Sequence, residues 1–592
     1  MQARHNAAFL RVRAVPGPAT DRPPMVFSLS WFVSRGHALL RSAWFSLVLV
    51  CLLALGLIVL GHDGKRVAQL VALAAPPFAW LFLPVRRAWV HRLRSALLWA
   101  WAMAFALDGV ARAYLLDAYQ AAPDSAMVLG AVANTNAREG AEYLRMHWRA
   151  ALLAVSGVTA VAAVLAVCLA RGLRSPQPPA RERPRPPSRA RRAALWGLGG
   201  AVMLPGAAAY ASKPWRRLHP VLFWTQWGDK VEHVRADWAG QQGARQALLE
   251  RARADAPSMA EDGPALVVLV ISDSVNRDNM SLYGYGRPTT PGLQAQQAVL
   301  GEAFTAFRQA WSADATTLPA LRNFFRFGEP DAAHPHHALA IARAAGYKVW
   351  WMSNHDDVGI EQMHARMADI TEMNNRTPGR SGASLDGEVL DGLEEALADP
   401  APRKLLVLHL MGAHPHYDLR FPEGANPFDD RPDAVDAMLE RAGRPAWLRD
   451  RREEYDAAVL YHDGIVSTVL RRTREGGTPG GYRAFMYLSD HGQEVGHGAN
   501  WAGHSPATPA GYRIPAIVWH NGRAPLAPQG LDRRPLRADW AGHTLVQLLR
   551  IDWKGYRADR DVLSPGYRWS PPEVAALAEA SRAQVRQEPA PH

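Results

Sequence analysis

Apolar residues are spread unevenly along this chain of 592 residues, and long apolar runs gather in its first third. A helix needs roughly 20 mostly apolar residues to cross the ~30 Å hydrocarbon core of a bilayer. Five stretches approach this length and predict an α-helical membrane domain over residues 43–211, with spans at about 43–61, 67–84, 95–116, 150–170 and 194–211. The second contains Pro76-Pro77 and the fifth is short and rich in Gly and Ala, so one weak span could instead be a buried or interfacial helix.

Arginines cluster in alternate connecting segments, and this sets the orientation of the spans. Residues 1–42, the segment 86–94 and the segment "RGLRSPQPPARERPRPPSRARR" (171–192) are strongly basic, whereas the other two loops are short or mixed in charge. Because basic loops stay in the cytoplasm, residues 1–42 are predicted to be a cytoplasmic segment and residues from 212 onward to lie on the opposite side. The net charge of +12 could by itself suggest nucleic acid, but this placement predicts a multi-pass membrane protein that contacts lipid and no nucleic acid.

One acidic residue, Asp108, lies inside the third predicted span. A carboxylate that faces lipid is costly. We therefore expect Asp108 to face protein or a water-filled cavity, with a structural partner and a substrate role both open.

The pattern changes after about residue 212, where short β-rich runs alternate with helical stretches. Residues 212–260 are predicted to be a linker with bridging helices, 261–570 a catalytic domain and 571–592 a tail. Five nearly continuous apolar runs predict buried strands: "ALVVLVIS" (265–272), "YKVWWMSN" (347–354), "KLLVLHLMG" (404–412), "AFMYLSDHG" (484–492) and "IPAIVWHN" (514–521). Such alternation is typical of an α/β fold with a central, mostly parallel sheet, in which chemistry takes place beyond the carboxyl ends of the strands.

Acidic and histidine side chains fall at the ends of these runs. Asp273 follows the first, His409 and His414 lie in and after the third, and Asp490-His491 end the fourth. Asp and His are ligands that suit zinc, so the pattern predicts a metal site. Taken singly, Asp273 would be an ordinary helix N-cap, the Asp-His pair an ordinary turn, and His409 a buried structural residue.

A nucleophile is expected on the helix that follows the first strand and its loop. Thr316-Thr317-Leu318-Pro319 precedes an apolar helix in "TTLPALRNFF". A hydroxyl at a helix N-terminus lies in a positive potential, and a nearby metal would activate it. Either threonine could also serve as an N-cap.

The order of "ISDSVNRDNMSLYGYGRPTTP", "TTLPALRNFF", "GYKVWWMSN", "HLMGAHPHYDLRFP" and "YLSDHGQEVGHGANWAGHSP" resembles the phosphoethanolamine transferases, which are inner-membrane members of the alkaline phosphatase/sulfatase superfamily. The resemblance covers about residues 260–525, and the five spans fit it as well. "HLMGAH", "GYKVWWMSN" and "LADPAPRK" are most similar to the branch that modifies the core sugar of lipopolysaccharide. The resemblance implies a bacterial inner-membrane enzyme, expected to be a monomer, with its catalytic domain in the periplasm.

The resemblance also implies roles for single residues. Asp273, at a position where the family usually has Glu, and Asp490-His491 are its zinc ligands, together with the nucleophile. His414 and His504 match two substrate-binding histidines of the family. Gln493 replaces the usual Glu after "DHG", and the cysteine pairs of the lipid A branch are missing, which weakens an assignment to lipid A.

The nucleophile and the lipid-binding residues are less closely defined by the resemblance. Spacing back from Pro319 favours Thr317 as nucleophile, with Thr316 and Ser312 open. The loop "VANTNAREGAEYL" resembles the segment that helps to hold the lipid head group, where capping of a helix by Asn134 or Thr135 is an equal alternative. His497 is a further ligand or, as we favour, an exposed loop residue. The further substrate-binding candidates are Asn354, Thr135 and Glu139.

Together these features predict zinc-dependent transfer of phosphoethanolamine from phosphatidylethanolamine to a lipopolysaccharide acceptor, core sugar or lipid A, through a phosphothreonine-type intermediate. Three alternatives share the fold: a phosphoglycerol transferase, a phosphodiesterase or sulfatase that transfers to water, and a catalytically inactive membrane receptor. The retained Asp273, Thr317, Asp490 and His491 argue against the inactive receptor.

Overall fold

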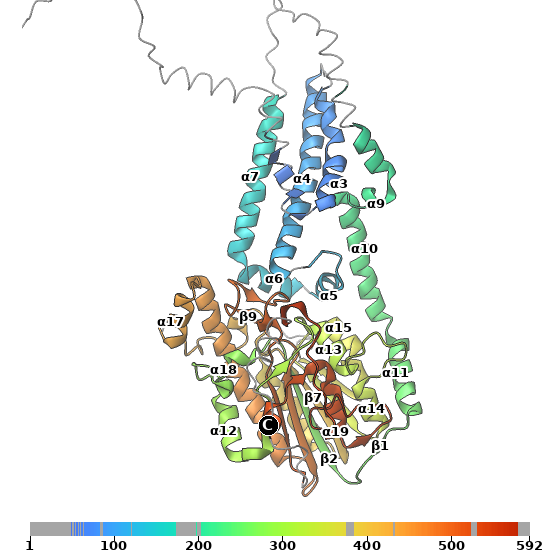
Figure 1. Ribbon diagram of the computed structural model, residues 1–592, viewed down its shortest axis with the longest axis vertical. Coiled ribbons are helices and arrows are strands. Elements are labelled where there is room, and N and C mark those ends of the chain that lie inside the picture. The colour runs from blue at the N-terminus through green and yellow to red at the C-terminus, as the bar shows by residue number, and fades with distance from the viewer. Residues whose placement is uncertain are drawn as a thin grey trace, which may run out of the picture.

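The computed structural model describes residues 64–82, 87–119, 121–135, 137–172, 203–374, 384–429, 432–522 and 530–577, together with residues 49, 52, 53, 55, 56, 58, 59, 61, 62 and 197. Long helices form a column at one end of the molecule, and a large α/β domain forms the other (Figure 1). The predicted segment 1–42 and most of the tail 571–592 lie outside the described residues.

Two helices of the described part are long and apolar enough to cross a membrane. These windows, Ala88–Asp117 and Ala151–Ala170, lie in α4 (Ala88–Tyr119) and α7 (Trp148–Gly172) and coincide with the third and fourth predicted spans. The second predicted span is divided into α3 (Gly64–Ala74) and the 3₁₀ helix η1 (Pro76–Phe82). The division falls at Pro76-Pro77, because proline cannot continue the helical hydrogen-bond ladder. Most of the first predicted span and the first half of the fifth lie outside the described residues, whereas residues 203–211 of the fifth are helical. The count of five therefore remains a prediction.

Asp108 has partners within the protein. Its Oδ1 accepts hydrogen bonds from Arg112 Nε at 2.8 Å and from Trp224 Nε1 at 2.9 Å. The Nε2 of His62 lies 3.5 Å from its Oδ2. Trp224 belongs to α10 (Pro220–Ala239), so the buried carboxylate fastens this helix to α4.

Five helices, the longest of which has 20 residues, join the helical column to the α/β domain. α9 (Lys213–Arg216), α10 and α11 (Gln242–Ala254) occupy the predicted linker and run down one side of the molecule (Figure 1). α5 (Ala126–Asn134) and α6 (Ala137–Met146) lie between the column and the α/β domain.

The α/β domain is built on a seven-stranded sheet in the order β3-β11-β8-β2-β7-β5-β6. Its strands are β3 (Phe304–Ala306), β11 (Ala516–His520), β8 (Tyr482–Ser489), β2 (Ala265–Ser272), β7 (Arg403–Leu410), β5 (Lys348–Ser353) and β6 (Ile370–Met373). β11 is antiparallel to both of its neighbours, and the other pairs are parallel. The mostly parallel α/β sheet is therefore confirmed, while the short edge strands β3 and β6 were not predicted.

Three small strand pairs lie outside the main sheet. They are β1 (Ser258–Met259) with β13 (Ile551–Asp552), β9 (Glu494–Val495) with β10 (Ala502–Gly503), and β4 (Ala310–Trp311) with β12 (Leu536–Arg537).

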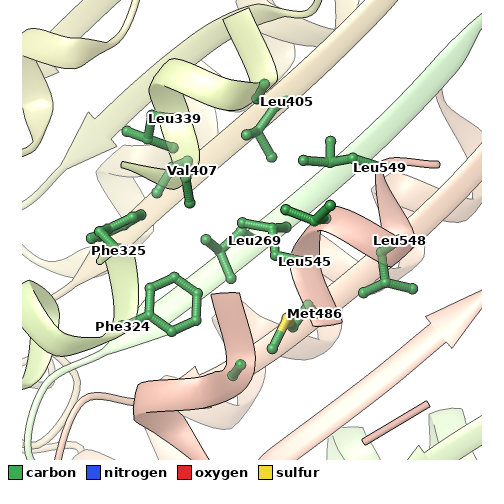
Figure 2. Packing of buried hydrophobic residues seen from close by; sticks show 14 of the residues in the cluster. Leu269, Phe324, Phe325, Leu339, Leu405, Val407, Met486, Leu545, Leu548 and Leu549 are labelled. Atoms are coloured by element: carbon green, nitrogen blue, oxygen red, sulfur yellow. The ribbon is translucent and has the colours of Figure 1, made fainter. Parts of the chain in front are cut away.

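Helices cover both faces of the sheet. α13 (Thr317–Phe325), α14 (Ala338–Ala344) and α19 (Ala541–Leu548) pack on one face, where Leu269 of β2 lies among Phe324, Phe325 and Leu545 (Figure 2). α12 (Pro291–Leu300), α16 (Val389–Ala398) and α18 (Ala446–Glu475) pack on the other. Alternate residues of β2 enter the two cores because side chains of a strand alternate between faces. α15 (Val358–Met363) and α17 (Ala434–Arg441) lie nearer the helical column (Figure 1).

The loop after β2 is fixed by a buried arginine. Arg287, in "GYGRPTTP", donates from Nε to Asp433 Oδ2 at 2.7 Å and from Nη1 to Asp456 Oδ2 at 2.9 Å. Asp456 lies on α18 and is fully buried. The loop that follows the first strand is thus held against the helix that covers that strand.

We expect Arg287→Met to lower the free energy of unfolding of this domain by about 3 kcal/mol, because it breaks the buried ion pair of Asp456. The carboxylate then keeps only the hydrogen bonds from Asn279 and Tyr285 and the more distant charge of Arg452. Denaturant unfolding of the full chain in detergent measures the change. The matched control is Arg308→Met, which removes an exposed ion pair to Asp532 of 2.8 Å and should cost less than about 1 kcal/mol. Equal losses in the two variants would contradict the assignment.

Candidate metal and nucleophile site

Two carboxylates meet where β2 and β8 end. Ser272 and Ser489 are paired at the last position of the two parallel strands, so Asp273 and Asp490 follow at the same level of the sheet. The backbone turns sharply there, since Ser274 has a positive φ of 62°. This turn lets Ser274 donate from N to Asp490 Oδ1 at 3.2 Å and from Oγ to Asp273 Oδ1 at 2.6 Å. Both carboxylates are buried.

Thr317 brings a hydroxyl to this pair of carboxylates. It is the first residue of α13, and its Oγ1 donates to Asp273 Oδ2 at 2.8 Å and lies 3.5 Å from His491 Nε2. Thr316 is the N-cap residue, although its side chain makes no capping bond. The buried Ser312 donates from Oγ to the carbonyl oxygen of Asp490 at 2.6 Å. Among these three candidates, Thr317 has the geometry expected of a nucleophile.

The orientation of His491 is set by a backbone contact. Its Nδ1 lies 2.7 Å from the carbonyl oxygen of Gly492, which accepts a hydrogen bond, so Nε2 keeps its lone pair. Nε2 lies 3.6 Å from Asp490 Oδ2 and 3.7 Å from Asp273 Oδ1. Ligand atoms of Asp273, His491 and His504 all lie within 4.8 Å of one another.

The chemistry of these residues fits a divalent cation. Asp490 Oδ2 and His504 Nε2 are buried and have no hydrogen-bond partner among the described residues. Burial and the neighbouring Asp273 raise the pKa of Asp490 to about 7, because two adjacent carboxylates in a dry site repel each other. A cation would relieve this repulsion and satisfy the free ligand atoms, and carboxylate with imidazole is a set that zinc accepts.

Of the other predicted site residues, His414 and Asn354 lie near the candidate site, whereas Thr135 and Glu139 lie at the end of α5 and in α6. His414 is near the site, with its ring centroid 5.9 Å from that of His504 and its Nδ1 buried without a partner among the described residues. Asn354 is near but turned to a structural partner, since its Nδ2 donates to Ser384 O at 2.9 Å. Thr135 donates from Oγ1 to Ala131 O of its own helix at 2.8 Å, and Glu139 lies beside Asp356 and Asp357.

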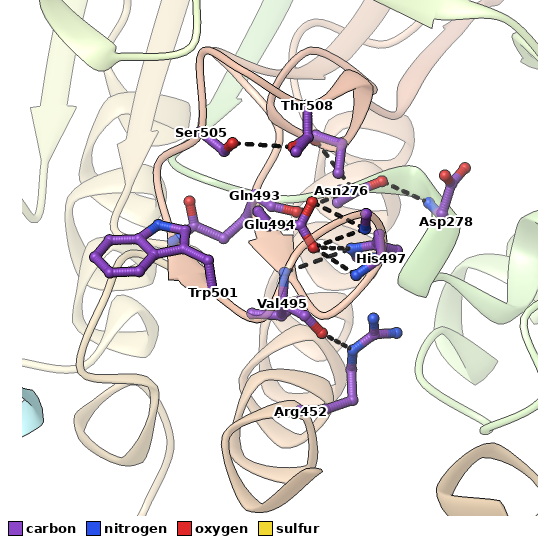
Figure 3. A network of polar contacts seen from close by, with 12 residues as sticks. Asn276, Asp278, Arg452, Gln493, Glu494, Val495, His497, Trp501, Ser505 and Thr508 are labelled. Carbon is purple, nitrogen blue, oxygen red and sulfur yellow. Dashed lines mark hydrogen bonds and ion pairs between the residues drawn. The ribbon is translucent and has the colours of Figure 1, made fainter. Parts of the chain in front are cut away.

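His409 and His497 have structural surroundings. His409 is fully buried, with Nδ1 3.2 Å from Ser353 Oγ and its ring stacked 4.0 Å from that of His355. His497 is mostly buried in the loop between β9 and β10, where Glu494 accepts from the backbone N–H of His497 and Gly498 (Figure 3). Our expectation that His497 is an exposed loop residue is therefore wrong in its exposure, because the Glu494 carboxylate draws the loop inward.

Sequence reasoning missed His355. Its Nδ1 lies 3.2 Å from Asp357 Oδ2 and its Nε2 3.2 Å from Leu410 O. Although burial opposes the charged form, the Asp357 hydrogen bond and the nearby Asp273 raise the pKa of His355 to about 9. The available signal was the position of His355 two residues after β5. The carboxyl end of that strand lies at the same edge of the sheet as the carboxyl end of β2.

Residues from α5 and α10, which join the helical column to the α/β domain, cover this edge of the sheet. Asn134 of α5 accepts from Gly359 N at 3.1 Å and also contacts Asp357. Leu318, next to the candidate nucleophile, packs in a cluster that includes Trp238 of α10. The site therefore faces the end of the molecule that holds the predicted spans (Figure 1).

A second contact reaches the loop that precedes His504. The indole of Trp501 donates from Nε1 to His504 O at 3.1 Å. Its ring stacks on that of His147, between α6 and α7, with centroids 5.4 Å apart and planes 13° apart. This loop thus touches the helical column on one side and the candidate metal site on the other.

Residues 265–549 match the Sulfatase family model. The phosphoethanolamine transferase EptC of Escherichia coli is 30% identical over 322 residues, 52% of this chain and 54% of that protein. The phosphoethanolamine transferase CptA of Salmonella typhimurium is 28% identical over 324 residues, again 52% and 54%. The chain spans about half the length of these relatives. The resemblance to phosphoethanolamine transferases drawn from the motifs is confirmed.

A solved structure extends the likeness to the helical column. The integral membrane protein lipooligosaccharide phosphoethanolamine transferase A of Neisseria meningitidis aligns with a TM-score of 0.52 and 18% identity, over 86% of this chain and 99% of that one. The two chains therefore share a fold in which a membrane-helical part is joined to a sulfatase-like α/β domain.

We expect zinc to raise the midpoint of thermal unfolding of the metal-stripped full chain. A ligand at a hundred times its Kd stabilises the folded state by about 2.7 kcal/mol. Asp490→Asn should abolish most of this increment. Asp463→Asn is the control, because Asp463 is a buried carboxylate that accepts from Gly292 N at 2.7 Å, away from the site; it should lower the midpoint yet keep the zinc increment. An unchanged increment in Asp490→Asn would exclude Asp490 as a ligand.

Proposed function

We propose that this chain transfers phosphoethanolamine from phosphatidylethanolamine to a lipopolysaccharide acceptor, with Thr317 as the nucleophile. The observation that carries the proposal is the contact of Thr317 Oγ1 with Asp273 Oδ2, at 2.8 Å, beside the lone pair of His491. The names of the relatives support the type of group transferred.

Asp273, Asp490 and His491 would hold the metal, which we propose to be zinc, with Thr317 as a further ligand. When bound, the ion supplies positive charge that favours the alkoxide of Thr317 and the developing charge on the phosphoryl oxygens. Asp273 has a side chain one methylene shorter than Glu, so it draws this charge closer to the end of β2. Ser274 holds the Asp273 carboxylate in place through its 2.6 Å hydrogen bond.

In the first step, Thr317 Oγ attacks the phosphorus of phosphatidylethanolamine. The bond between phosphorus and the diacylglycerol oxygen breaks, and that oxygen takes up the proton lost by the threonine. Phosphoethanolamine is then esterified to Thr317. In the second step, an acceptor hydroxyl attacks the same phosphorus, its proton goes to the Thr317 oxygen, and the enzyme is regenerated.

The histidines around the nucleophile would handle the phosphoryl group and the protons. His414 and His504 have free ring nitrogens that face a site with a charged substrate. His355, which holds its proton near neutral pH, would add positive charge close to Asp273 and the incoming phosphate.

The covering of the site by α5 and α6 supports a lipid donor. Asn134, Thr135 and Glu139 belong to this covering layer, and we propose that Glu139 and Thr135 lie along the path of the lipid head group. A location in the bacterial inner membrane, with the α/β domain in the periplasm, would keep the site beside the outer leaflet that holds the donor. The motifs "HLMGAH" and "GYKVWWMSN" favour core sugar over lipid A as the acceptor.

The nucleophile can be identified with a fluorescent phosphatidylethanolamine and the full chain in detergent. We expect release of fluorescent diacylglycerol and a phosphoethanolamine mass increment on the peptide that contains Thr317. Thr317→Ala should lower the rate by about 10³-fold or more, because a covalent route loses its attacking atom.

Thr316→Ala and Ser312→Ala are the matched controls, and they should keep the mass increment on Thr317. An adduct on either of these residues, or full turnover in Thr317→Ala, would refute the assignment. Phosphatidylglycerol offered in place of phosphatidylethanolamine distinguishes a phosphoglycerol transferase from the proposed activity.

A further inference from the structure

The junction of α6 and α7 packs against the α/β domain close to the candidate site. We call the group of Arg145, Trp148, Arg149, His416, Trp447 and Arg451 the α6–α7 corner. α18 reaches this junction because Tyr455, one turn after Arg451, lies with its ring centroid 5.1 Å from that of Tyr417, the residue after His416. His416 donates from its backbone N to Met146 Sδ at 3.5 Å, which brings the segment after β7 to the end of α6. His416 follows His414 by two residues, so the corner adjoins the site along the chain.

The corner is rich in cations around a buried imidazole. His416 is 6% exposed, and its Nε2 has no hydrogen-bond partner among the described residues. Burial, and then Arg420, His147, Arg451 and Arg145, lower the pKa of His416 to about 3. The imidazole is therefore neutral in a region of positive potential, and an anion placed there would be stabilised.

The three arginines among these cations are available to a ligand to different degrees. Arg420 is buried and paired with Glu142 Oε2 at 3.1 Å, so its charge is already balanced. Arg451 is paired with Glu454 one turn along α18, but this pair is partly exposed, at 24% and 25%, so water weakens it and a phosphate can compete with Glu454. Arg145 is exposed and makes no ion pair within the described part of the chain. Exposed arginines offer the forked donors that match phosphate oxygens.

Exposed tryptophans flank the same corner. Trp148, the first residue of α7, is 53% exposed, and Arg149 lies over its ring at 5.5 Å. Trp447 is 39% exposed and precedes Arg451 by four residues, so both lie on one face of α18. Tryptophan is enriched at membrane–water interfaces, and α17 and the start of α18 belong to the part of the α/β domain that is nearer the helical column (Figure 1).

We propose that the α6–α7 corner binds a phosphate group of the acceptor, a phosphorylated glycolipid held in the same leaflet, through Arg145 and Arg451. The proposal rests on the proposed function and names the part of the acceptor that is recognised. His416 donates or accepts a hydrogen bond from Nε2 beneath this phosphate, and Trp148 and Trp447 lie against the lipid–water boundary on either side. The phosphate holds the glycolipid while a sugar hydroxyl reaches the phosphothreonine.

The test uses the full chain in detergent with phosphatidylethanolamine as donor. The acceptor is purified lipid A that still carries its core sugars, with or without its phosphates, and these two forms are called phosphorylated and dephosphorylated lipid A below. Arg145→Gln combined with Arg451→Gln should raise the KM for phosphorylated lipid A by about tenfold or more, as expected for lost charge-assisted hydrogen bonds. The KM for dephosphorylated lipid A should be high in both proteins and should change less than about twofold. The Lys variants at both positions should recover part of the affinity.

Arg441→Gln on α17 is the control, because Arg441 is an exposed arginine of the same region whose side chain bonds Ala437 O in its own helix. It should leave the KM for lipid A unchanged. The proposal is overturned if the double variant keeps the parent KM, or if its KM rises equally for dephosphorylated lipid A.

The first half-reaction separates this proposal from the proposed function. If the parent protein releases no diacylglycerol from phosphatidylethanolamine, the proposed function fails. A binding measurement then still tests whether the α6–α7 corner binds phosphate. It compares the binding of phosphorylated lipid A to the parent and to the double variant by co-sedimentation at two salt concentrations. Tighter, salt-sensitive binding to the parent supports it, since exposed charge pairs are screened by salt, and equal binding overturns it.

Discussion

The repulsion between Asp273 and Asp490 is the constraint on which the rest of the site depends. The parallel pairing of β2 with β8 brings the two carboxylates to one level, and the burial of both excludes the water that would screen them. Such a pair is stable only with a proton or a cation between its oxygens. The Nδ1 contact of His491 leaves its Nε2 free beside this pair, and Thr317 at the start of α13 brings its hydroxyl to Asp273. Both groups therefore lie where a proton or a cation is needed.

Much of this arrangement could be predicted because it follows from local rules. The five apolar runs became strands, and a polar residue at the end of a parallel strand reaches the functional edge wherever it lies in the sequence. Asn354 shows the limit of that rule: its place at the edge is correct, but its side chain turns to Ser384. The structural role of the Trp501 loop could not be foreseen, because its partner His147 is more than 350 residues away in the sequence and no local pattern marks such pairs.

The helical column and the α/β domain are joined through polar contacts as well as apolar packing. Asp108 accepts a hydrogen bond from Trp224 of α10, and Asn134 of α5 accepts one from Gly359 N in the first turn of α15. Both groups are buried or partly buried, where a lost hydrogen bond leaves an unsatisfied polar atom. The joint therefore fixes the orientation of the sheet edge more closely than a flexible linker would, and the site keeps its face toward the predicted spans.

The stack of Trp501 on His147 bears on how the α/β domain behaves when it is cut from the rest. An excised fragment beginning near α11 would lose the imidazole against which the indole lies. The turn that carries His504 would then be held only by its contacts with the α/β domain. Crystals or solution studies of such a fragment would report this histidine in a wider range of orientations than the intact chain allows, whereas Asp273 and Asp490, held at the ends of β2 and β8, would keep theirs.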